Sequence, residues 1–228
     1  MASTAGVRIS PSLMCADFLH LADDLRVLSV PGGADYLHVD VMDGSYVPNF
    51  TLGPDFCRAV SAASSLPLDI HLMVDLPERH VASFACFPGA IVSIHPETTA
   101  HPLRTLDQIR SLGARAGISL DPAMPVSAVT EMLPYVSLAC VMTVNPGYAG
   151  QELVPSTMGK IRQLSDLVAE RGWDVEIEVD GHVSWDNVSQ MVDAGAGVLV
   201  AGSSSLFDGA APLADNLRRL RGLLHRAR

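Results

Sequence analysis

Histidine and aspartate residues recur near the ends of three short apolar segments of this sequence. His38 and Asp40 lie in D-Y-L-H-V-D-V-M-D-G, His71 lies in L-D-I-H-L-M, and Asp180 ends E-I-E-V-D. Residues two apart on a strand point to the same side of it, so these side chains could converge. Each one alone could equally be a hydrogen-bonded core histidine or a helix-capping aspartate. Together, two imidazoles and two carboxylates form a mixed nitrogen and oxygen donor set, which indicates a divalent metal site.

The two aspartates also suggest proton transfer at a carbon atom. Asp40 and Asp180 come from the second and the seventh strand-like segment, which would lie on opposite sides of a barrel mouth. A substrate between them would meet one carboxylate on each face, so that one removes a proton and the other returns one. Carboxylates are weak bases, so a divalent metal must first acidify the carbon, polarise the carbonyl and hold the resulting enediolate.

Other residues at expected strand ends could contact the same substrate. Met42, Met73 and Met142 could flank a planar intermediate without offering it a proton, although they could also simply fill the core. His95 could touch the site or belong to a turn, and Glu178 could support a ligand from behind or be structural. The remaining histidines, His20, His80, His101 and His225, are expected on the surface.

Three loops have the composition of a phosphate site. They read N-P-G-Y-A-G-Q (145–151), D-G-H-V-S (180–184) and A-G-S-S-S (201–205), and they contain no lysine or arginine. Small residues let backbone N–H groups approach an anion, and helix N-termini favour its charge. Ordinary turn chemistry could explain each loop alone, but three neighbouring loops of this kind favour a bound phosphate.

The elements that would position these residues alternate regularly along the chain. Strand-like segments are expected at 7–12, 36–41, 68–73, 91–94, 114–120, 138–143, 175–179 and 198–201, and helical patterns at 16–28, 77–86, 103–112, 155–171, 185–194 and 212–226. An open doubly wound sheet is the competing fold, but no G-x-G-x-x-G follows the first segment. Eight β-α units and no linker predict an α/β fold, a single (β/α)8 TIM barrel of the phosphate-binding type, as one domain over 1–228.

Composition narrows the function classes. The chain has 228 residues, 48% of them hydrophobic, and a formal net charge of −10, which argues against nucleic acid as a partner. No apolar run is long enough to span a membrane, and M-A-S-T-A-G-V-R-I-S does not read as a secretory signal. The four cysteines are scattered, which fits a cytoplasmic protein. The only lysine, Lys160, lies in a helical pattern, so Schiff-base chemistry is not expected.

Six segments together resemble the ribulose-phosphate 3-epimerase family from about residue 7 to residue 224. They are I-S-P-S-L-M-C-A-D, H-V-D-V-M-D-G-S-Y-V-P-N, L-D-I-H-L-M-V, H-P-E-T, V-M-T-V-N-P-G-Y-A-G-Q and E-I-E-V-D-G. The resemblance implies a barrel enzyme that uses one divalent metal, often zinc, with iron, manganese or cobalt also suited to the ligands. It implies metal ligation by His38, Asp40, His71 and Asp180, with Asp40 and Asp180 as the acid/base pair.

The resemblance also implies a set of substrate contacts. Ser12 and His71 would touch the sugar, and the strand-end positions of the three methionines place them around it. The phosphate end would be formed by Gly147, Tyr148, Ala149, Gly150, Gly181, His182, Gly202, Ser203 and Ser204.

Within the family, several motifs look most like the D-allulose-6-phosphate 3-epimerase branch. The chain has G-Y-A-G-Q rather than G-F-G-G-Q, and it has V-D-G-H and G-S-S-S-L-F where typical ribulose-phosphate epimerases read V-D-G-G and G-S-A. His182 departs from the small residue expected in either branch and could add a donor or shorten the pocket. The expected reaction is therefore D-allulose 6-phosphate to D-fructose 6-phosphate, with ribulose 5-phosphate to xylulose 5-phosphate as the alternative.

Two more distant functions fit the sequence less well. A phosphate-barrel decarboxylase would usually place a lysine beside the carboxylates, and no lysine is available at these strand ends. A sugar-phosphate binding protein without turnover would not need both aspartates. The expected partner is a small sugar phosphate, and the chain is expected to form a homo-oligomer.

Overall fold

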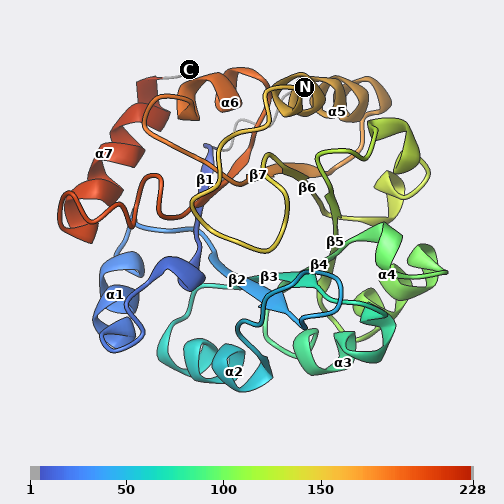
Figure 1. Cartoon of the computed structure of the whole chain (residues 1–228), viewed down its shortest axis with the longest axis horizontal. Helices are drawn as coiled ribbons and strands as arrows, with labels where there is room; N and C mark the ends of the chain where they lie inside the picture. The colour runs from blue at the N-terminus through green and yellow to red at the C-terminus, as the bar shows by residue number, and fades with distance from the viewer. Residues whose placement is uncertain (1–5, 227–228) are drawn as a thin grey trace.

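Eight parallel strands form the centre of the computed structural model, which describes residues 6–226 (Figure 1). The order β1-β8-β7-β6-β5-β4-β3-β2 runs around a ring, and a parallel bridge between Ser12 and His38 joins β1 to β2. The predicted (β/α)8 TIM barrel is therefore confirmed. The strands are β1 (Arg8–Pro11), β2 (Leu37–Met42), β3 (Leu68–Met73), β4 (Ile91–Ile94), β5 (Arg115–Leu120), β6 (Leu138–Met142), β7 (Glu176–Asp180) and β8 (Val198–Ala201).

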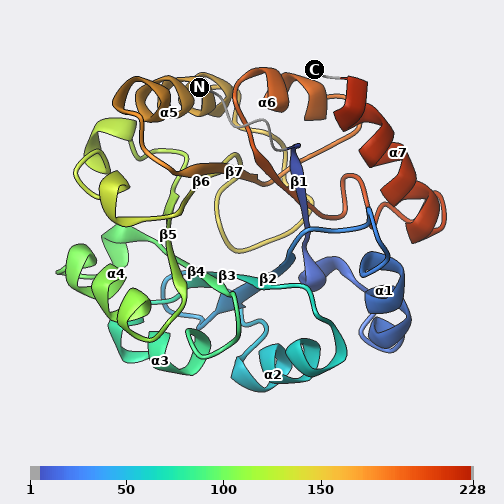
Figure 2. The same ribbon diagram turned by 180° about the vertical axis from the view of Figure 1, so that it is seen from behind.

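Helices surround the strands, as both end-on views show (Figures 1 and 2). The α-helices are α1 (Leu21–Leu28), α2 (Pro54–Ala63), α3 (Val81–Phe84), α4 (Pro102–Ser111), α5 (Thr157–Arg171), α6 (Val188–Asp193) and α7 (Leu213–Arg226). Local sequence sets several of their ends. Pro54 begins α2, where its missing N–H costs nothing, and Gly172 ends α5 in the left-handed conformation, with φ 65°.

Three helical expectations need correction. The segment between β5 and β6 contains only the short 3-10 turns Val126–Ala128 and Leu133–Tyr135, because Pro122, Pro125 and Pro134 interrupt helical hydrogen bonding. The pattern at 77–86 divides into a 3-10 turn, Pro77–Arg79, and α3. The helix expected from residue 16 begins at Leu21, because the Asp17 carboxylate accepts the Leu19 N–H and forms a turn there. Two further 3-10 turns are Leu13–Cys15 and Pro96–Thr98.

On β2, β3 and β7, alternating side chains give an apolar outer face and an inner face that carries polar residues. The outward residues of β2 and β3 pack in the core beneath the helices; they are Leu37, Val39, Val41, Leu68, Ile70 and Leu72. The residues between them include His38, Asp40, Asp69 and His71, all of which are buried. On β7, Ile177 and Val179 join the outer core, which leaves Glu178 and Asp180 on the other face. The apolar face thus stabilises the barrel while the inner face can carry chemistry.

Side-chain and helix properties agree with the composition. All four cysteines are free thiols. Within residues 6–226, no helix combines the length and the hydropathy needed to cross a bilayer. Residues 1–5, part of the stretch considered for a leader, lie outside the described residues. The assignment of residues 1–228 to one domain stays a prediction.

Candidate active site

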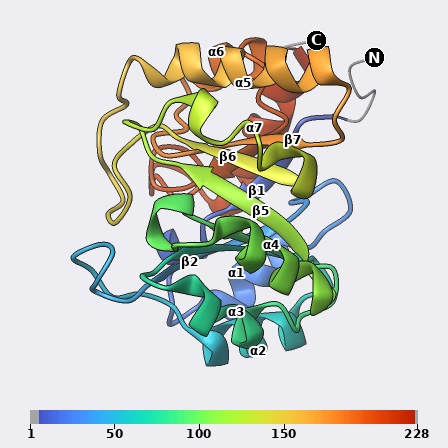
Figure 3. The same cartoon turned by 90° about the vertical axis from the view of Figure 1, so that its right-hand side faces the viewer.

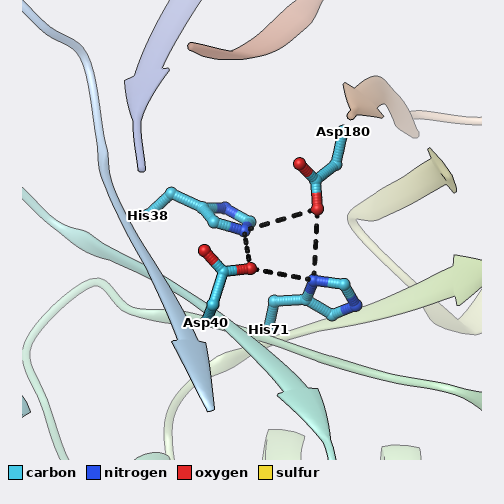
Figure 4. Close-up of side chains that lie close together, drawn as sticks. All are labelled: His38, Asp40, His71 and Asp180. Atoms are coloured by element: carbon cyan, nitrogen blue, oxygen red, sulfur yellow. Dashed lines mark ion pairs between the residues drawn. The ribbon is translucent and has the colours of Figure 1, made fainter. Parts of the chain in front are cut away.

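Four side chains from three strands meet at the carboxyl end of the barrel (Figure 4). His38 Nε2 lies 3.3 Å from Asp40 Oδ1 and 3.9 Å from Asp180 Oδ2. His71 Nδ1 lies 3.7 Å from the same Asp40 oxygen and 3.4 Å from the same Asp180 oxygen. The structure therefore brings together all four residues that the sequence predicted as metal ligands, and a metal ion could bind between them.

Strand register explains the convergence. In the β2–β3 ladder, Asp40 pairs with His71, so these two residues are adjacent at the same level of the barrel. His38 precedes Asp40 by two residues on β2 and shares its face. Asp180 ends β7 opposite Met142 of β6 and reaches the cluster from the other side of the barrel. Catalytic groups of such barrels gather at this end.

The donor atoms of this cluster fit a divalent metal. His38 Nε2 and His71 Nδ1 are buried and have no hydrogen-bond partner among the described residues, which is costly unless something binds them. In a tetrahedral site with bonds of about 2.0–2.1 Å, neighbouring ligand atoms lie about 3.3–3.4 Å apart. The four separations of 3.3, 3.4, 3.7 and 3.9 Å come close to that spacing.

The electrostatics of the cluster call for positive charge. Burial alone would raise the pKa of Asp40, but the facing His38 outweighs burial and the pKa lies far below its ordinary value. Burial alone would lower the pKa of His38, but the carboxylates of Asp69 and Asp40 raise it well above its ordinary value. His71 follows the same pattern, with Asp180 and Asp40 raising its pKa against burial. A divalent cation can supply the charge that protons on these rings would otherwise supply.

Hydrogen bonds behind the cluster hold two of its members in place. His38 Nδ1 lies 2.7 Å from Asp69 Oδ2, which also accepts a bond from Ser10 Oγ at 2.8 Å. A carboxylate behind a metal-ligating histidine directs the other ring nitrogen at the metal. Ser12 Oγ donates to Asp40 Oδ2 at 2.8 Å, which places Ser12 beside the predicted acid/base residue. The sequence reasoning missed Asp69, although its position two residues before His71 puts it on the same strand face.

Glu178 lies deeper in the same interior. Burial and the neighbouring Asp69 raise the pKa of Glu178 well above the ordinary value, which favours the protonated form of its carboxyl group. His38, Asp69 and Glu178 also have donor atoms within 4.8 Å of one another. A second metal there is disfavoured, because Asp69 Oδ2 already bonds to Ser10 Oγ and His38 Nδ1, and the raised pKa of Glu178 works against its charged form. Glu178 is thus a buried neighbour of the cluster, as the sequence suggested.

His95 is buried directly behind His71, so it contacts a residue of the cluster and does not line the cavity itself. Its Nε2 lies 2.9 Å from His71 Nε2. Its Nδ1 faces Tyr46 Oη at 3.1 Å and Glu97 Oε1 at 3.3 Å. Tyr46 and Glu97 carried no signal in the sequence analysis, because their contact with His95 depends on the conformation of two loops.

A cavity next to the cluster contains nearly every predicted substrate contact. Its lining includes Ser12, Met42, Met73, Met142, Gly147, Tyr148, Ala149, Gly150, Gly181, His182, Gly202, Ser203 and Ser204, together with Asp40 and Asp180. His71 is not part of this lining and faces the cluster instead. Sequence reasoning missed Met14 and Cys15, which also line the cavity, as do Asn145 and Gln151 at the two ends of the predicted 145–151 loop. The cavity therefore connects both aspartates with the glycine-rich loops.

The loop after β2 and the loop after β6 extend beyond the same end of the barrel (Figure 3). The loop after β2 and the loop after β6 are joined by a bond from Asn49 Nδ2 to the Gly147 carbonyl, at 2.8 Å. Gly181, with φ 106°, could not be alanine without movement, because a Cβ would lie 2.6 Å from a methyl group of Val144. Close backbone packing thus shapes the predicted phosphate end of the cavity.

His182 has an uncommon backbone conformation for a residue with a side chain. Its φ is 46°, in the left-handed region that favours glycine. Its Nδ1 lies 2.7 Å from the Gln151 carbonyl, and its own carbonyl accepts a bond from Asn187 at 2.7 Å. The imidazole therefore bonds to the loop after β6 and borders the cavity, as the sequence analysis anticipated for a bulky residue here.

The remaining basic candidates lie away from this chemistry. Lys160 Nζ donates to the carbonyls of Asp121 and Pro122, both at 2.8 Å, and Lys160 does not line the cavity. The four histidines expected on the surface, His20, His80, His101 and His225, are all exposed.

Comparison of the whole chain with known proteins identifies its relatives. The sequence model of the ribulose-phosphate 3 epimerase family matches residues 8–207. The chain is 43% identical to the chloroplastic ribulose-5-phosphate-3-epimerase of Arabidopsis thaliana, over 89% of this chain and 72% of the relative. It is 43% identical to ribulose-phosphate 3-epimerase of a Synechocystis species, over 86% of each chain, and 39% identical to that of Escherichia coli K12, over 88% of each.

Solved structures with much lower identity share the fold alone. Orotidine 5'-phosphate decarboxylase from Pyrococcus horikoshii is 12% identical, with a TM-score of 0.65 over 95% of this chain and 99% of that one. Thiamine phosphate pyrophosphorylase from Pyrococcus furiosus is 11% identical, with a TM-score of 0.62 over 96% and 95%. By contrast, the family match covers most of the sequence at substantial identity. The chain therefore belongs to the ribulose-phosphate 3-epimerase family and is a ketose-phosphate epimerase, an enzyme of the isomerase class.

Proposed function

We propose that this chain interconverts D-ribulose 5-phosphate and D-xylulose 5-phosphate by inverting C3. The observation that carries the proposal is the placement of Asp40 and Asp180 on opposite sides of one cluster that borders the cavity. Inversion at carbon needs a proton removed from one face and a proton delivered to the other. Two carboxylates that approach from β2 and β7 supply one group for each face.

The roles of the individual residues follow from their contacts. In one direction Asp40 takes the C3 proton while Asp180 donates one, and in the reverse direction the two exchange roles. Ser12 orients Asp40 through its hydrogen bond to Oδ2. Met42, Met73 and Met142 border the cavity with side chains that cannot protonate a carbanion-like intermediate from the wrong side.

A divalent ion held by His38, Asp40, His71 and Asp180 would lower the pKa of the C3–H bond by polarising the adjacent carbonyl. We propose zinc, because two imidazoles and two carboxylates are common zinc ligands; iron, manganese and cobalt suit the same ligands. Metal analysis of the protein purified without added metal identifies the ion.

We further propose that the phosphate lies at the glycine- and serine-rich side of the cavity. Gly181 and Gly202 permit a close approach of the backbone, and Ser203 and Ser204 can add hydroxyl donors. No lysine or arginine lines this cavity, so recognition would depend on N–H and O–H groups.

The pentulose phosphate is preferred to the hexulose phosphate that the loop motifs suggested. The relatives at 39–43% identity carry the name ribulose-phosphate 3-epimerase, whereas the case for D-allulose 6-phosphate rests on a few loop residues. His182 also occupies space at the predicted phosphate side, which favours a shorter substrate. Allulose 6-phosphate is therefore the second candidate.

The substrate preference can be measured directly. We expect kcat/KM of the metal-loaded protein to be at least about 100-fold higher for D-ribulose 5-phosphate than for D-allulose 6-phosphate, equivalent to roughly 3 kcal/mol of transition-state binding. His182→Gly tests the contribution of the imidazole. This variant should reduce the difference in kcat/KM between the two substrates, because the space left by the imidazole admits the longer sugar. A preference of the unaltered protein for the hexulose would contradict the substrate assignment and leave the epimerase chemistry intact.

Assembly and compartment stay predictions. A homo-oligomer is expected, and sedimentation of the purified protein tests it. A cytoplasmic location is likewise expected, although the name of one relative places that protein in the chloroplast.

A further inference from the structure

The buried His95 takes no part in the reaction proposed above, yet its ring meets the ring of His71 edge to edge. The ring centroids are 5.1 Å apart and the interplanar angle is 27°. The two Nε2 atoms are separated by 2.9 Å, which is a hydrogen-bond distance. Two nitrogen lone pairs cannot share that distance, so one ring must donate a proton and the other must accept it.

The opposite edge of His95 determines which ring donates. Glu97 Oε1 lies 3.3 Å from His95 Nδ1 and accepts the Tyr46 hydroxyl proton at 2.8 Å. Since Tyr46 gives its proton to Glu97, the lone pair of its oxygen faces His95 Nδ1 at 3.1 Å. Nδ1 of His95 therefore meets two acceptors and carries the proton, which leaves a lone pair on its Nε2.

The consequence reaches the metal cluster through His71. If His95 Nε2 accepts, His71 Nε2 carries a proton and His71 Nδ1 has its lone pair free. That Nδ1 is the atom that lies 3.4 Å from Asp180 and 3.7 Å from Asp40. The chain Glu97–His95–His71 thus directs a lone pair at the position between the aspartates.

We propose that His95 and Glu97 are positioning residues that fix the tautomer of His71 and so determine how tightly the cluster binds its metal. This inference rests on the metal site proposed above. The other histidine of the cluster is oriented without an intervening residue, because His38 Nδ1 bonds directly to the Asp69 carboxylate at 2.7 Å. For His71, the carboxylate is that of Glu97, and it acts through the intervening imidazole of His95. The hydrogen bond from Tyr46 connects Glu97 to the loop after β2.

Paired substitutions at His95 test the proposal through metal binding. His95→Leu removes the atom that accepts the His71 Nε2 proton. His95→Gln replaces that atom, His95 Nε2, with an amide oxygen that can accept the same proton. We expect the dissociation constant for Zn²⁺, measured by competition with a chelator, to rise about 10- to 100-fold in His95→Leu. His95→Gln should restore most of the affinity. The visible absorption of bound Co²⁺ should change in the leucine variant and stay close to normal in the glutamine variant.

Thr98→Val is the matched control. The Thr98 hydroxyl donates to the His95 carbonyl at 2.7 Å, so this variant loses one buried hydrogen bond in the same turn but keeps the imidazole. Its Zn²⁺ affinity should equal that of the unaltered protein. Glu97→Leu, at a partly exposed side chain, is a second disrupting variant should His95→Leu fail to fold, and its affinity should fall in the same direction.

The outcomes separate this inference from the proposed function. Unchanged Zn²⁺ affinity in His95→Leu and Glu97→Leu would overturn the inference alone, as would nitrogen NMR of the Zn²⁺-loaded protein showing the His71 proton on Nδ1. Failure of the unaltered protein to bind Zn²⁺ or Co²⁺ would contradict the proposed metal site and this inference together. Weaker binding in both disrupting variants, with normal binding in Thr98→Val, supports the tautomer assignment.

Discussion

Asp180→Asn is expected to abolish epimerisation while the barrel stays folded. The amide has nearly the same shape as the carboxylate, but it cannot take or deliver the C3 proton. Positioned acid/base groups contribute about 10²- to 10⁴-fold to rate, and this residue also ligates the proposed metal, so we expect a loss of about 10³-fold or more in kcat. Its side chain is 14% exposed, so the substitution leaves the packed core undisturbed.

A control and a second readout sharpen this prediction. Asp186→Asn changes an exposed aspartate in the loop after the same strand and should leave kcat unchanged. In deuterated water, Asp180→Asn that is saturated with metal should still exchange the C3 proton of the one epimer that faces Asp40. Near-normal turnover by Asp180→Asn would show that the acid/base assignment is wrong.

Removal of the metal is expected to have an effect of similar size. A divalent ion supplies several kcal/mol of charge stabilisation in reactions of this kind, so treatment with a strong chelator should lower kcat by about 10³-fold or more. Added Zn²⁺, Mn²⁺, Co²⁺ or Fe²⁺ should restore it to different extents. The two imidazole nitrogens without a partner are the structural reason for this dependence.

Thermal unfolding gives an independent measure of the same binding. An ion present at about 100 times its dissociation constant stabilises the folded state by about 2.7 kcal/mol. For a chain of this size the corresponding increase in Tm is about 5 to 10 °C. His38→Ala should lose the increase, whereas His80→Ala, at an exposed histidine, should keep it. Full activity after chelation, with no metal left in the protein, would contradict the proposed mechanism.

Much of the site could be predicted because strand periodicity is a short-range property. The spacing of His38 and Asp40 assigns both to one face as soon as the segment is a strand, and β3 has the predicted bounds, 68–73. The count of eight strand-like segments then implies a closed ring, which brings β2 and β7 to the same mouth. Core packing enforces this pattern, because a shift by one residue would turn Leu37 and Val39 into the barrel interior and place His38 and Asp40 against the helices.

The features that could not be predicted depend on loops and on distant contacts. His95 lies edge to edge with His71, and Tyr46 reaches His95 from a loop that no periodicity describes. The left-handed backbone of His182 is held by Asn187 and Gln151, and its residue type gives no sign of it. Three prolines between β5 and β6 indicate that no α-helix forms there. The regular alternation of strands and helices elsewhere in the chain nevertheless favoured a helix at this position.

Substrate length was the least predictable property for a similar reason. The hexulose expectation depended on a few residues in loops, chiefly those after β6 and β8, whose conformation strand periodicity does not describe. The two aspartates and two histidines, by contrast, are tied to strand positions that leave little freedom. The chemistry is therefore better determined by the sequence than the sugar on which it acts.

The central claim is that two carboxylates exchange protons with opposite faces of C3. The most direct test is to incubate the metal-loaded protein with D-ribulose 5-phosphate in deuterated water and to analyse the xylulose 5-phosphate formed in the first turnovers. We predict deuterium at C3 of the product, because the group that delivers the proton is not the group that removed it. Xylulose 5-phosphate that forms with its original C3 hydrogen would contradict the two-carboxylate account.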